Sequence, residues 1–342
     1  MSIKICSIGD IMLGENIHHY HRGIPTCYRG NFGELITRPV AEIMNHGDIV
    51  IGNLECSLMS DQEHRKAPLK RAMYSAPESV LDCFKKLKTP IILNLANNHF
   101  GQHGQAAADY TMNCLDKRGI NYIGMKRTPM IFVINGWKIC IWGATLVKED
   151  FSVNYIKSSA ETLIKDLKWK DKANNEIWII SLHWGTEYRT QPERSQQKLA
   201  QKLTSFGVNL VLGHHPHVIQ PVETMREGRI FYSHGNFIFD QNFSKITKIG
   251  LISLTDVEHN ISDYYLTQSH KYKVELCSKV SAQDLRDFCY KWSSPFLPLA
   301  MRFLMKLELC IKLNKVPRQV WLHILYQLSR KTKLQINKIS RN

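Results

Sequence analysis

The sequence predicts an α/β fold, and two features of its first 240 residues carry that prediction. Short, nearly continuous apolar runs recur, as expected of strands covered on both faces. Segments of helical periodicity lie between many of these runs, and such alternation is typical of α/β proteins. The 342 residues, 44% hydrophobic and 22% charged, have a globular composition, and a chain of this length can bury a large core.

Six apolar runs are predicted strands, and each ends in a cluster of Gly, Asn, Asp, Glu or His. They are residues 3–8, 48–51, 90–95, 176–182, 208–212 and 229–232. Region 120–150 is expected to add further strands, and residues 261–267 and 271–276 are expected to form a β pair.

The predicted helices are marked by Pro in the first turn, by capping residues or by a Gly beyond the last turn. They are residues 77–84, 105–117, 158–167, 192–206, 284–292, 298–313 and 317–328. Residues 14–35 and 56–76 are rich in Gly, Pro and polar side chains, so we expect long loops there. Long loops on such a scaffold often shape a binding site.

The nine cysteines are scattered and include no C-x-x-C pair, which argues against a disulfide framework or a structural zinc site. This pattern favours a reducing compartment. The first residues do not resemble a signal peptide, and no apolar stretch of about 18 residues indicates a spanning helix. We therefore expect a cytoplasmic protein, possibly peripheral to the inner face of the membrane.

The net charge of +15 is concentrated near the end of the chain. Residues 291–342 contain 11 Lys and Arg but only one acid, Glu308. We therefore expect a main domain over 1–255 and a basic, mostly helical extension over 256–342. Within 295–342, apolar residues alternate with cations. They could simply be helices packed on the main domain, and we expect such packing together with peripheral contact with a membrane or biosynthetic complex. No motif indicates a specific nucleic-acid partner.

The polar clusters at the strand ends predict a metal centre, because ligands of open α/β sheets bind beyond the carboxyl ends of strands. The side chains expected to converge are Asp10, Glu55, Asn98, His99, His183, His215 and His217. Carboxylate, amide and imidazole groups suit one or two ions of Mn, Fe or Zn. Two such ions about 3.5–4 Å apart can share a water and supply hydroxide to a phosphoester near neutral pH.

Each of these assignments has a simpler alternative. His215 and His217 could cap a polar turn, although three His within residues 214–217 are hard to explain by packing alone. Asp10 could cap the loop that follows its strand. Asn53 lies so close to Glu55 that the sequence leaves open which of the two reaches a metal.

The order of the strand-end motifs resembles the CapA/PgsA family of bacterial capsule and poly-γ-glutamate synthesis proteins. The motifs are Gly9-Asp10-Ile11-Met12-Leu13-Gly14, Asn53-Leu54-Glu55, Asn97-Asn98-His99, His183-Trp184-Gly185-x-Glu187-Tyr188, His215-Pro216-His217-Val218 and Tyr232-Ser233-x-Gly235-Asn236-Phe237. The resemblance covers about residues 3–243. It implies a layered β-sheet core flanked by helices, related to calcineurin-like metallophosphoesterases.

The resemblance also implies roles for single residues. The implied metal ligands are Asp10, Asn53, Glu55, Asn98, His183, His215 and His217. His99 matches an imidazole that could protonate a leaving oxygen, and Asp10 belongs to the catalytic centre with it. Glu187, Ser233 and Asn236 are expected to contact substrate. His214 and His234 are expected to surround the ligands rather than to be ligands.

The sequence departs from the wider phosphoesterase pattern at two positions. Met12 stands where a metal-binding His is usual, and Gln102 stands where Asp often follows the Asn-Asn-His motif. The first hypothesis is therefore a metal-dependent hydrolase that acts on a phosphorylated intermediate of capsule, poly-γ-glutamate or other cell-surface polymer synthesis. The second is a non-hydrolytic component of a membrane-associated synthesis complex that binds metal or an anionic polymer.

Overall fold

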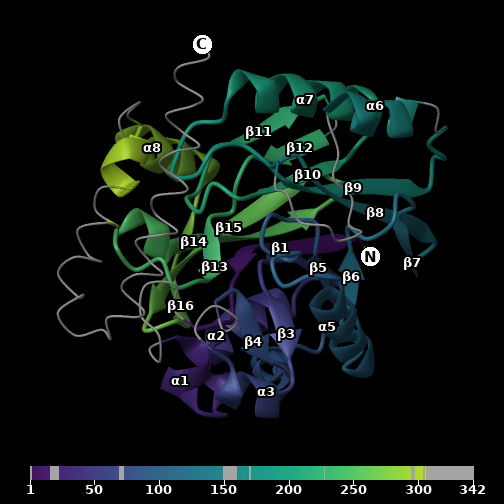
Figure 1. Cartoon of the computed structure of the whole chain (residues 1–342). Helices are drawn as coiled ribbons and strands as arrows, with labels where there is room; N and C mark the ends of the chain where they lie inside the picture. The colour runs from purple at the N-terminus through teal and green to yellow at the C-terminus, as the bar shows by residue number, and fades with distance from the viewer. Residues whose placement is uncertain are drawn as a thin grey trace, which may run out of the picture.

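The structure is a computed structural model. Two β-sheets stacked face to face form its centre (Figure 1). The structure describes residues 2–15, 23–68, 73–148, 160–168, 171–226, 228–293, 297–302 and 305. In spatial order, the first sheet contains β16 (Lys273–Val280), β15 (Ile261–His270), β14 (Ile249–Asp256), β1 (Lys4–Ile11), β2 (Ile49–Leu54), β5 (Ile91–Asn94) and β6 (Asn121–Ile123). The short strand β13 (Asn236–Ile238) also pairs with β1.

The second sheet has a parallel centre and antiparallel edges. Its order is β11 (Val222–Met225), β12 (Gly228–Phe231), β10 (Leu210–His214), β9 (Glu176–His183), β8 (Trp137–Thr145) and β7 (Met130–Ile134). A separate pair is formed by β3 (Ser57–Met59) and β4 (Ser75–Pro77). In the first sheet, β1, β2, β5 and β6 run parallel to one another, so their carboxyl ends lie at one edge.

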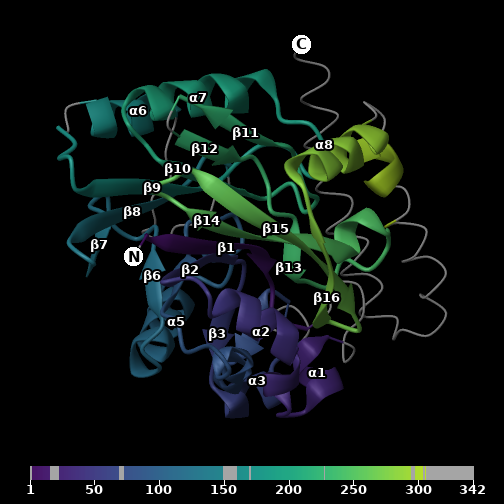
Figure 2. The same cartoon turned by 180° about the vertical axis from the view of Figure 1, so that it is seen from behind.

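Helices cover the outer faces of both sheets, which produces a four-layered α/β structure (Figures 1 and 2). The α-helices are α1 (Ile24–Tyr28), α2 (Arg38–Met44), α3 (Asp61–Lys66), α5 (Gln105–Lys117), α6 (Ala160–Lys168), α7 (Arg194–Ser205) and α8 (Ala282–Lys291). The 3₁₀ helices are η1 (Phe32–Glu34), η2 (Glu78–Phe84) and η3 (Ile246–Lys248). Helices α6 and α7 lie over the second sheet, and α1, α2 and α5 lie beside the first.

Alternating side chains on each strand build the core between the two sheets. Ile5 and Ile51 of the first sheet belong to the same buried cluster as Ile141, Ile179 and Leu212 of the second. Fully burying one such aliphatic side chain contributes about 1.5–3 kcal/mol to stability. The residues between them in each strand face the helices, because successive side chains of a strand point to opposite faces. This explains why the strands are nearly continuous apolar runs.

The structure confirms the predicted α/β class and the six predicted strands, which differ only at their ends. The expectation of long loops over 14–35 and 56–76 was wrong in part. Helix α1 begins with Pro25 in its first turn, and α3 begins with a capping box formed by Ser60 and Glu63. Both signals are present in the sequence, but each helix is too short to show a clear periodicity. The helix predicted at 77–84 is the 3₁₀ helix η2.

The expected boundary at residue 255 falls inside a continuous β-meander. Strands β14, β15 and β16 pair in sequence, and β14 pairs with β1, so the chain after residue 255 first extends the main sheet. The predicted β pair and the helix at 284–292 are both observed, the latter as α8. Residues 297–302 and 305 are helical. The remainder of the two helices predicted at 298–313 and 317–328 lies outside the described residues. No helix in the described part of the chain is both long and apolar enough to span a bilayer.

Strand β1 approaches the segment before β13 too closely for any side chain at Gly9. The amide of Asp10 donates to the carbonyl oxygen of Gly235 at 2.9 Å. A Cβ atom built on Gly9 would lie 2.0 Å from that same oxygen. Since backbone atoms cannot move aside as a flexible side chain can, Gly9 is needed to bring Asp10 beside β13.

We predict that Gly9→Ala lowers the free energy of unfolding by about 1–3 kcal/mol, the usual effect of overpacking a dense core. Urea denaturation of the metal-free protein measures it. Ser7→Ala in the same strand is the matched control, because the buried Ser7 hydroxyl has no hydrogen-bond partner among the described residues and should be removed without loss. Equal stability of the two variants would contradict the predicted contact.

Candidate metal centre

The strand register of both sheets brings the predicted site residues to one place. Asp10 near the end of β1 pairs with Asn53 on β2 and with Asn236 on β13. His183 at the end of β9 pairs with His214 at the end of β10. Because the two sheets are stacked, the carboxyl ends of strands from both sheets supply side chains to a single buried cluster.

Asp10, Glu55 and His183 form the centre of this cluster. Each offers one ligand atom, and these atoms all lie within 4.8 Å of one another. All three residues have a relative exposure of 0%. The Glu55 Oε2 atom has no hydrogen-bond partner within the described structure. Two carboxylates removed from water need a positive partner, since unpaired buried charges are strongly unfavourable.

Burial and the neighbouring charges separate the pKa values of the two carboxyl groups. Burial and the nearby Asp10 raise the pKa of Glu55 well above its usual range. Burial alone would also raise the pKa of Asp10, but the imidazoles of His214 and His217 beside it hold that pKa well below its usual value. The surroundings of Glu55 therefore disfavour its ionised form, and a divalent cation beside it would stabilise that form.

Asn53 acts as a donor in this structure, so the prediction that it is a metal ligand does not fit its orientation. Its Nδ2 atom lies 2.8 Å from Asp10 Oδ1, 2.8 Å from Glu55 Oε1 and 3.2 Å from His183 Nδ1. Its Oδ1 atom accepts instead from Asn97 Nδ2 at 3.3 Å. This hydrogen-bond network assigns the amide orientation. Of the two neighbouring candidates, Glu55 is the one with an oxygen available to a cation.

His183 and Asn98 contact each other directly. His183 Nε2 lies 2.8 Å from Asn98 Oδ1, while His183 Nδ1 lies 3.6 Å from Glu55 Oε1. With Nε2–H donating to Asn98, the lone pair of Nδ1 faces the carboxylates. Burial and the nearby His215 lower the pKa of His183 well below its usual value. A neutral imidazole is the form that binds a metal.

The turn after β10 places His215 and His217 beside the carboxylates. Both have positive φ angles, 97° and 58° respectively, on either side of Pro216. The backbone amide of His215 donates to Asp10 Oδ2 at 3.2 Å, and the His215 ring centre lies 4.7 Å from that of His183. Such backbone strain in a non-Gly residue persists where the surroundings enforce it, often at functional sites.

His217 contacts both carboxylates through different ring nitrogens. Its Nδ1 atom lies 3.3 Å from Asp10 Oδ2, and its Nε2 atom lies 3.9 Å from Glu55 Oε2. Burial alone would lower the pKa of His217, but Glu55 and Asp10 raise it to about 9. The charge of the half-buried Glu187, an expected substrate contact, also raises this pKa.

His214 and His234 lie on the side of Asp10 that faces Ser253. His214 Nδ1 is 3.2 Å from Asp10 Oδ1, and its ring stacks against that of His234 with centres 6.1 Å apart. His234 Nε2 in turn lies 3.0 Å from Ser253 Oγ. Burial lowers the pKa of His234 to about 3, so this ring is neutral near pH 7.

His99 is oriented by contacts on three sides. Its ring stacks on Tyr74 with centres 3.6 Å apart and an interplanar angle of 7°. Its Nδ1 atom lies 3.3 Å from Gln102 Oε1, and its Nε2 atom lies 3.3 Å from Asn98 Nδ2. Gln102 therefore supplies a hydrogen-bond acceptor at the position where the wider pattern has Asp. Asn98 links His99 to the metal cluster.

Three residues outside the predicted set of ligands and substrate contacts also shape the site. Asn97 is fully buried, and its Oδ1 atom accepts from the amides of His99 and Phe100 at 3.1 and 2.9 Å. It thereby holds the turn that presents Asn98 and His99. Tyr74 stacks on His99, and Phe239 packs on His217 with ring centres 4.7 Å apart. The Asn-Asn-His motif was a signal for Asn97, but nothing local indicated Tyr74.

Ser233 and Asn236, expected to contact substrate, both have partners inside the protein. Ser233 is fully buried, and its Oγ atom accepts from the amide of Gly235 at 3.1 Å. Asn236 Oδ1 lies 3.0 Å from His217 Nδ1. Their burial is explained by these contacts without a substrate.

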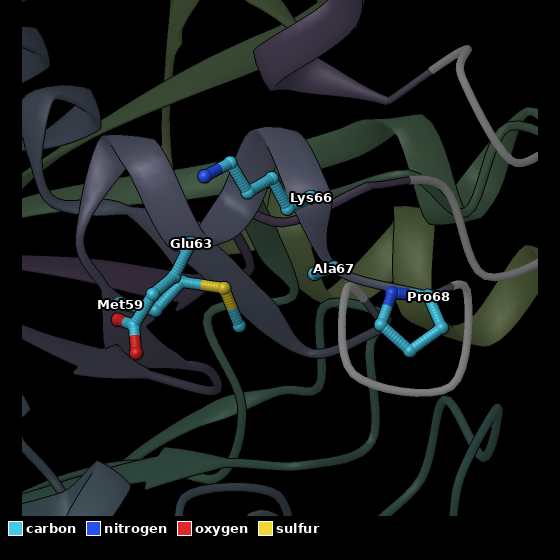
Figure 3. Close-up of a pocket in the computed structure, with 5 residues that line it drawn as sticks. All are labelled: Met59, Glu63, Lys66, Ala67 and Pro68. Carbon is cyan, nitrogen blue, oxygen red and sulfur yellow. The ribbon is translucent and has the colours of Figure 1, made fainter.

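The donor set fits a divalent cation. Asp10, Glu55 and His183 would hold it, with His217 next to both carboxylates. A cavity seen elsewhere, beside α3, is lined by Met59, Glu63, Lys66, Ala67 and Pro68 and contains none of the predicted site residues (Figure 3). The buried cluster at the strand ends is therefore the candidate site.

Comparison with known proteins agrees with the strand-end motifs. Residues 4–241 match the family described as bacterial capsule synthesis protein PGA_cap, and the chain belongs to this family. It is 29% identical over 268 residues to the capsule biosynthesis protein CapA of Bacillus anthracis, a match that covers 73% of this chain and 63% of that protein. It is 28% identical over 260 residues to the PGA biosynthesis protein CapA of Bacillus subtilis, which covers 72% and 65%.

The chain thus spans less than two thirds of the length of these two relatives. Among solved structures, it is similar to a novel phosphatase from Mycoplasma pneumoniae, with 12% identity and a TM-score of 0.42, over 85% of this chain and 99% of that one.

We predict that Mn²⁺ stabilises the protein through this cluster. At 100 times the dissociation constant, a ligand bound only by the folded state adds about 2.7 kcal/mol. The shift in melting temperature should disappear in His183→Ala and persist in His259→Ala, which removes an exposed imidazole paired with Asp256. Differential scanning calorimetry with and without Mn²⁺ tests this, and an equal shift in both variants would place the ion elsewhere.

Proposed function

We propose that this protein is a divalent-metal-dependent phosphoester hydrolase of cell-surface polymer synthesis. The observation that carries the proposal is the buried group of Asp10, Glu55 and His183, which leaves a Glu55 oxygen without a partner in the described structure. Membership of the capsule synthesis family supplies the biological setting. Mn, Fe and Zn are the ions that best match a mixed set of carboxylate and imidazole donors.

A bound divalent ion would supply Lewis-acid activation of a phosphoryl oxygen and of water. The side chains of the protein supply the remaining functions. Asp10 and Glu55 provide the negative charge that retains the ion, and Asn53 fixes their oxygens through its two amide hydrogens. His99, whose Nδ1–H is held by Gln102, is the side chain that would protonate the leaving oxygen once its ring has taken up a second proton. Stacking on Tyr74 restricts the rotation of the His99 ring.

The substrate class that we propose is a phosphorylated or anionic intermediate of a polymer. The relatives are named for capsule and PGA biosynthesis, and the net charge of +15 attracts anions over a long range. We also propose that residues 295–342, most of which lie outside the described residues, contact a membrane surface or a biosynthetic complex through their excess of cations.

A second candidate function is metal or polymer binding without hydrolysis, and the environment of Met12 favours it. Met12 is fully buried, and its thioether accepts from the amide of Gly14 at 3.1 Å. The wider phosphoesterases have a His at this position, so one ion position has fewer strong donors here. A single retained ion would bind an anion but would lack the second ion that usually activates the attacking water.

Hydrolysis of two phosphomonoesters by the Mn²⁺-loaded protein separates these candidates. We predict that His215→Ala abolishes measurable turnover of p-nitrophenyl phosphate. His99→Gln should lower kcat for an alkyl phosphate by about 10²–10⁴-fold, the usual contribution of a general acid. It should change kcat for p-nitrophenyl phosphate far less, because p-nitrophenolate leaves without a proton.

His259→Ala is the control and should retain full activity toward both esters. Turnover that survives both EDTA and His215→Ala would contradict the proposed mechanism. Tight Mn²⁺ binding without turnover of any phosphoester would instead support the second candidate. An equal effect of His99→Gln on both esters would remove His99 from the role of general acid.

A further inference from the structure

Asn236 was expected to contact substrate, but its contacts indicate another role. We propose that Asn236 is a positioning residue that sets the ring orientation of His217, and that Gln241 and Tyr188 hold Asn236 in place. The inference rests on the proposed metal-dependent function, because it concerns which nitrogen of His217 would be available to an ion. All four side chains are buried, with relative exposures of 1–4%.

The amide orientation of Asn236 follows from its two other partners. Asn236 Nδ2 lies 2.9 Å from the carbonyl oxygen of Thr247 and 3.3 Å from Gln241 Oε1. Both partners are acceptors, so the amide nitrogen must face them. The Oδ1 atom of Asn236 therefore faces His217 Nδ1, at 3.0 Å. An oxygen in this position requires His217 to carry a proton on Nδ1.

This proton placement determines which ring nitrogen of His217 serves the metal centre. The Nδ1–H group is shared between Asn236 Oδ1 at 3.0 Å and Asp10 Oδ2 at 3.3 Å. In the neutral ring, the form that binds a metal, the Nε2 atom then has the lone pair, and it lies 3.9 Å from Glu55 Oε2. Ligating imidazoles usually donate their second N–H to such a partner, which fixes both tautomer and ring direction.

Gln241 and Tyr188 extend these contacts into a closed loop. Gln241 Nε2 donates to the Tyr188 hydroxyl at 3.2 Å, and the Gln241 carbonyl accepts from Thr247 Oγ1 at 2.6 Å. The backbone amide of Tyr188 donates to the carbonyl of Pro216, next to His217, at 2.7 Å. Asn236 is therefore connected to the His217 turn twice, once directly through the His217 ring and once through Gln241, Tyr188 and the Pro216 carbonyl. Two connections restrict the Asn236 amide more than its hydrogen bond to His217 would alone.

The test measures Mn²⁺ affinity by isothermal titration calorimetry of the full chain, with thermal melting of the metal-free protein alongside. We expect Asn236→Leu to weaken Mn²⁺ binding about 10–100-fold, the usual effect of removing an outer partner of a ligand. Asn236→Asp keeps an oxygen opposite His217 Nδ1. It should therefore retain the affinity within a few-fold, although its second oxygen faces two acceptors and should lower the melting temperature.

A matched pair of Gln variants separates a loss of Mn²⁺ affinity from a general loss of stability. Gln241→Leu and Gln220→Leu each remove a buried amide, but the Gln220 side chain donates to the carbonyls of Arg189 and Gln191 and has no hydrogen bond, among the described residues, to Asn236, His217, Gln241 or Tyr188. Both should lower stability, and only Gln241→Leu should weaken Mn²⁺ binding. Unchanged affinity in Asn236→Leu, or an equal loss in Asn236→Asp, would overturn the inference. Failure of the wild-type chain to bind Mn²⁺ would instead contradict the proposed function.

Discussion

The structure of the site depends on keeping two carboxylates, Asp10 and Glu55, fully out of water at the junction of two sheets. Such burial is tolerated only where hydrogen bonds or cations replace the lost hydration. Asn53 spans both groups, the His215 amide and two imidazoles surround Asp10, and one oxygen of Glu55 has no partner in the described part of the chain. Many of the polar residues at the strand ends therefore serve to replace the hydration of these two carboxylates.

The stacking of the two sheets brings together the groups that replace the hydration of Asp10 and Glu55. The side chains of the cluster come from both sheets. Asp10 and Glu55 lie near the ends of β1 and β2 in the first sheet, and His183 and His217 lie at or just beyond the ends of β9 and β10 in the second. The isoleucine layer between the sheets fixes their separation, and Gly9 permits β1 to touch the segment before β13. Apolar packing thus determines the distances between charged groups that are far apart in the sequence.

The sequence predicts the class of fold and places polar side chains at the strand ends, because both depend on patterns within single strands. It predicts amide orientation poorly. Whether Asn53 presents oxygen or nitrogen depends on Asn97, and whether Asn236 faces substrate or His217 depends on Thr247 and Gln241. These partners are several to many residues away and meet only in the folded chain. Short helices such as α1 and α3 were missed for a different reason, since five or six residues are too few to show a clear helical periodicity.

The residues that surround His217 also contact a part of the chain that lies beyond the family match. Tyr188, at one end of the loop of contacts around His217, packs in a cluster with Val218, Ile246 and Met301. Met301 belongs to the helical segment 297–302, which lies well after residue 241, where the family match ends. Because buried clusters transmit displacement rather than absorb it, the segment that packs on Tyr188 has a direct mechanical route to the orientation of His217. Residues 297–302 therefore pack, through Met301, on a side chain that supports the candidate metal centre.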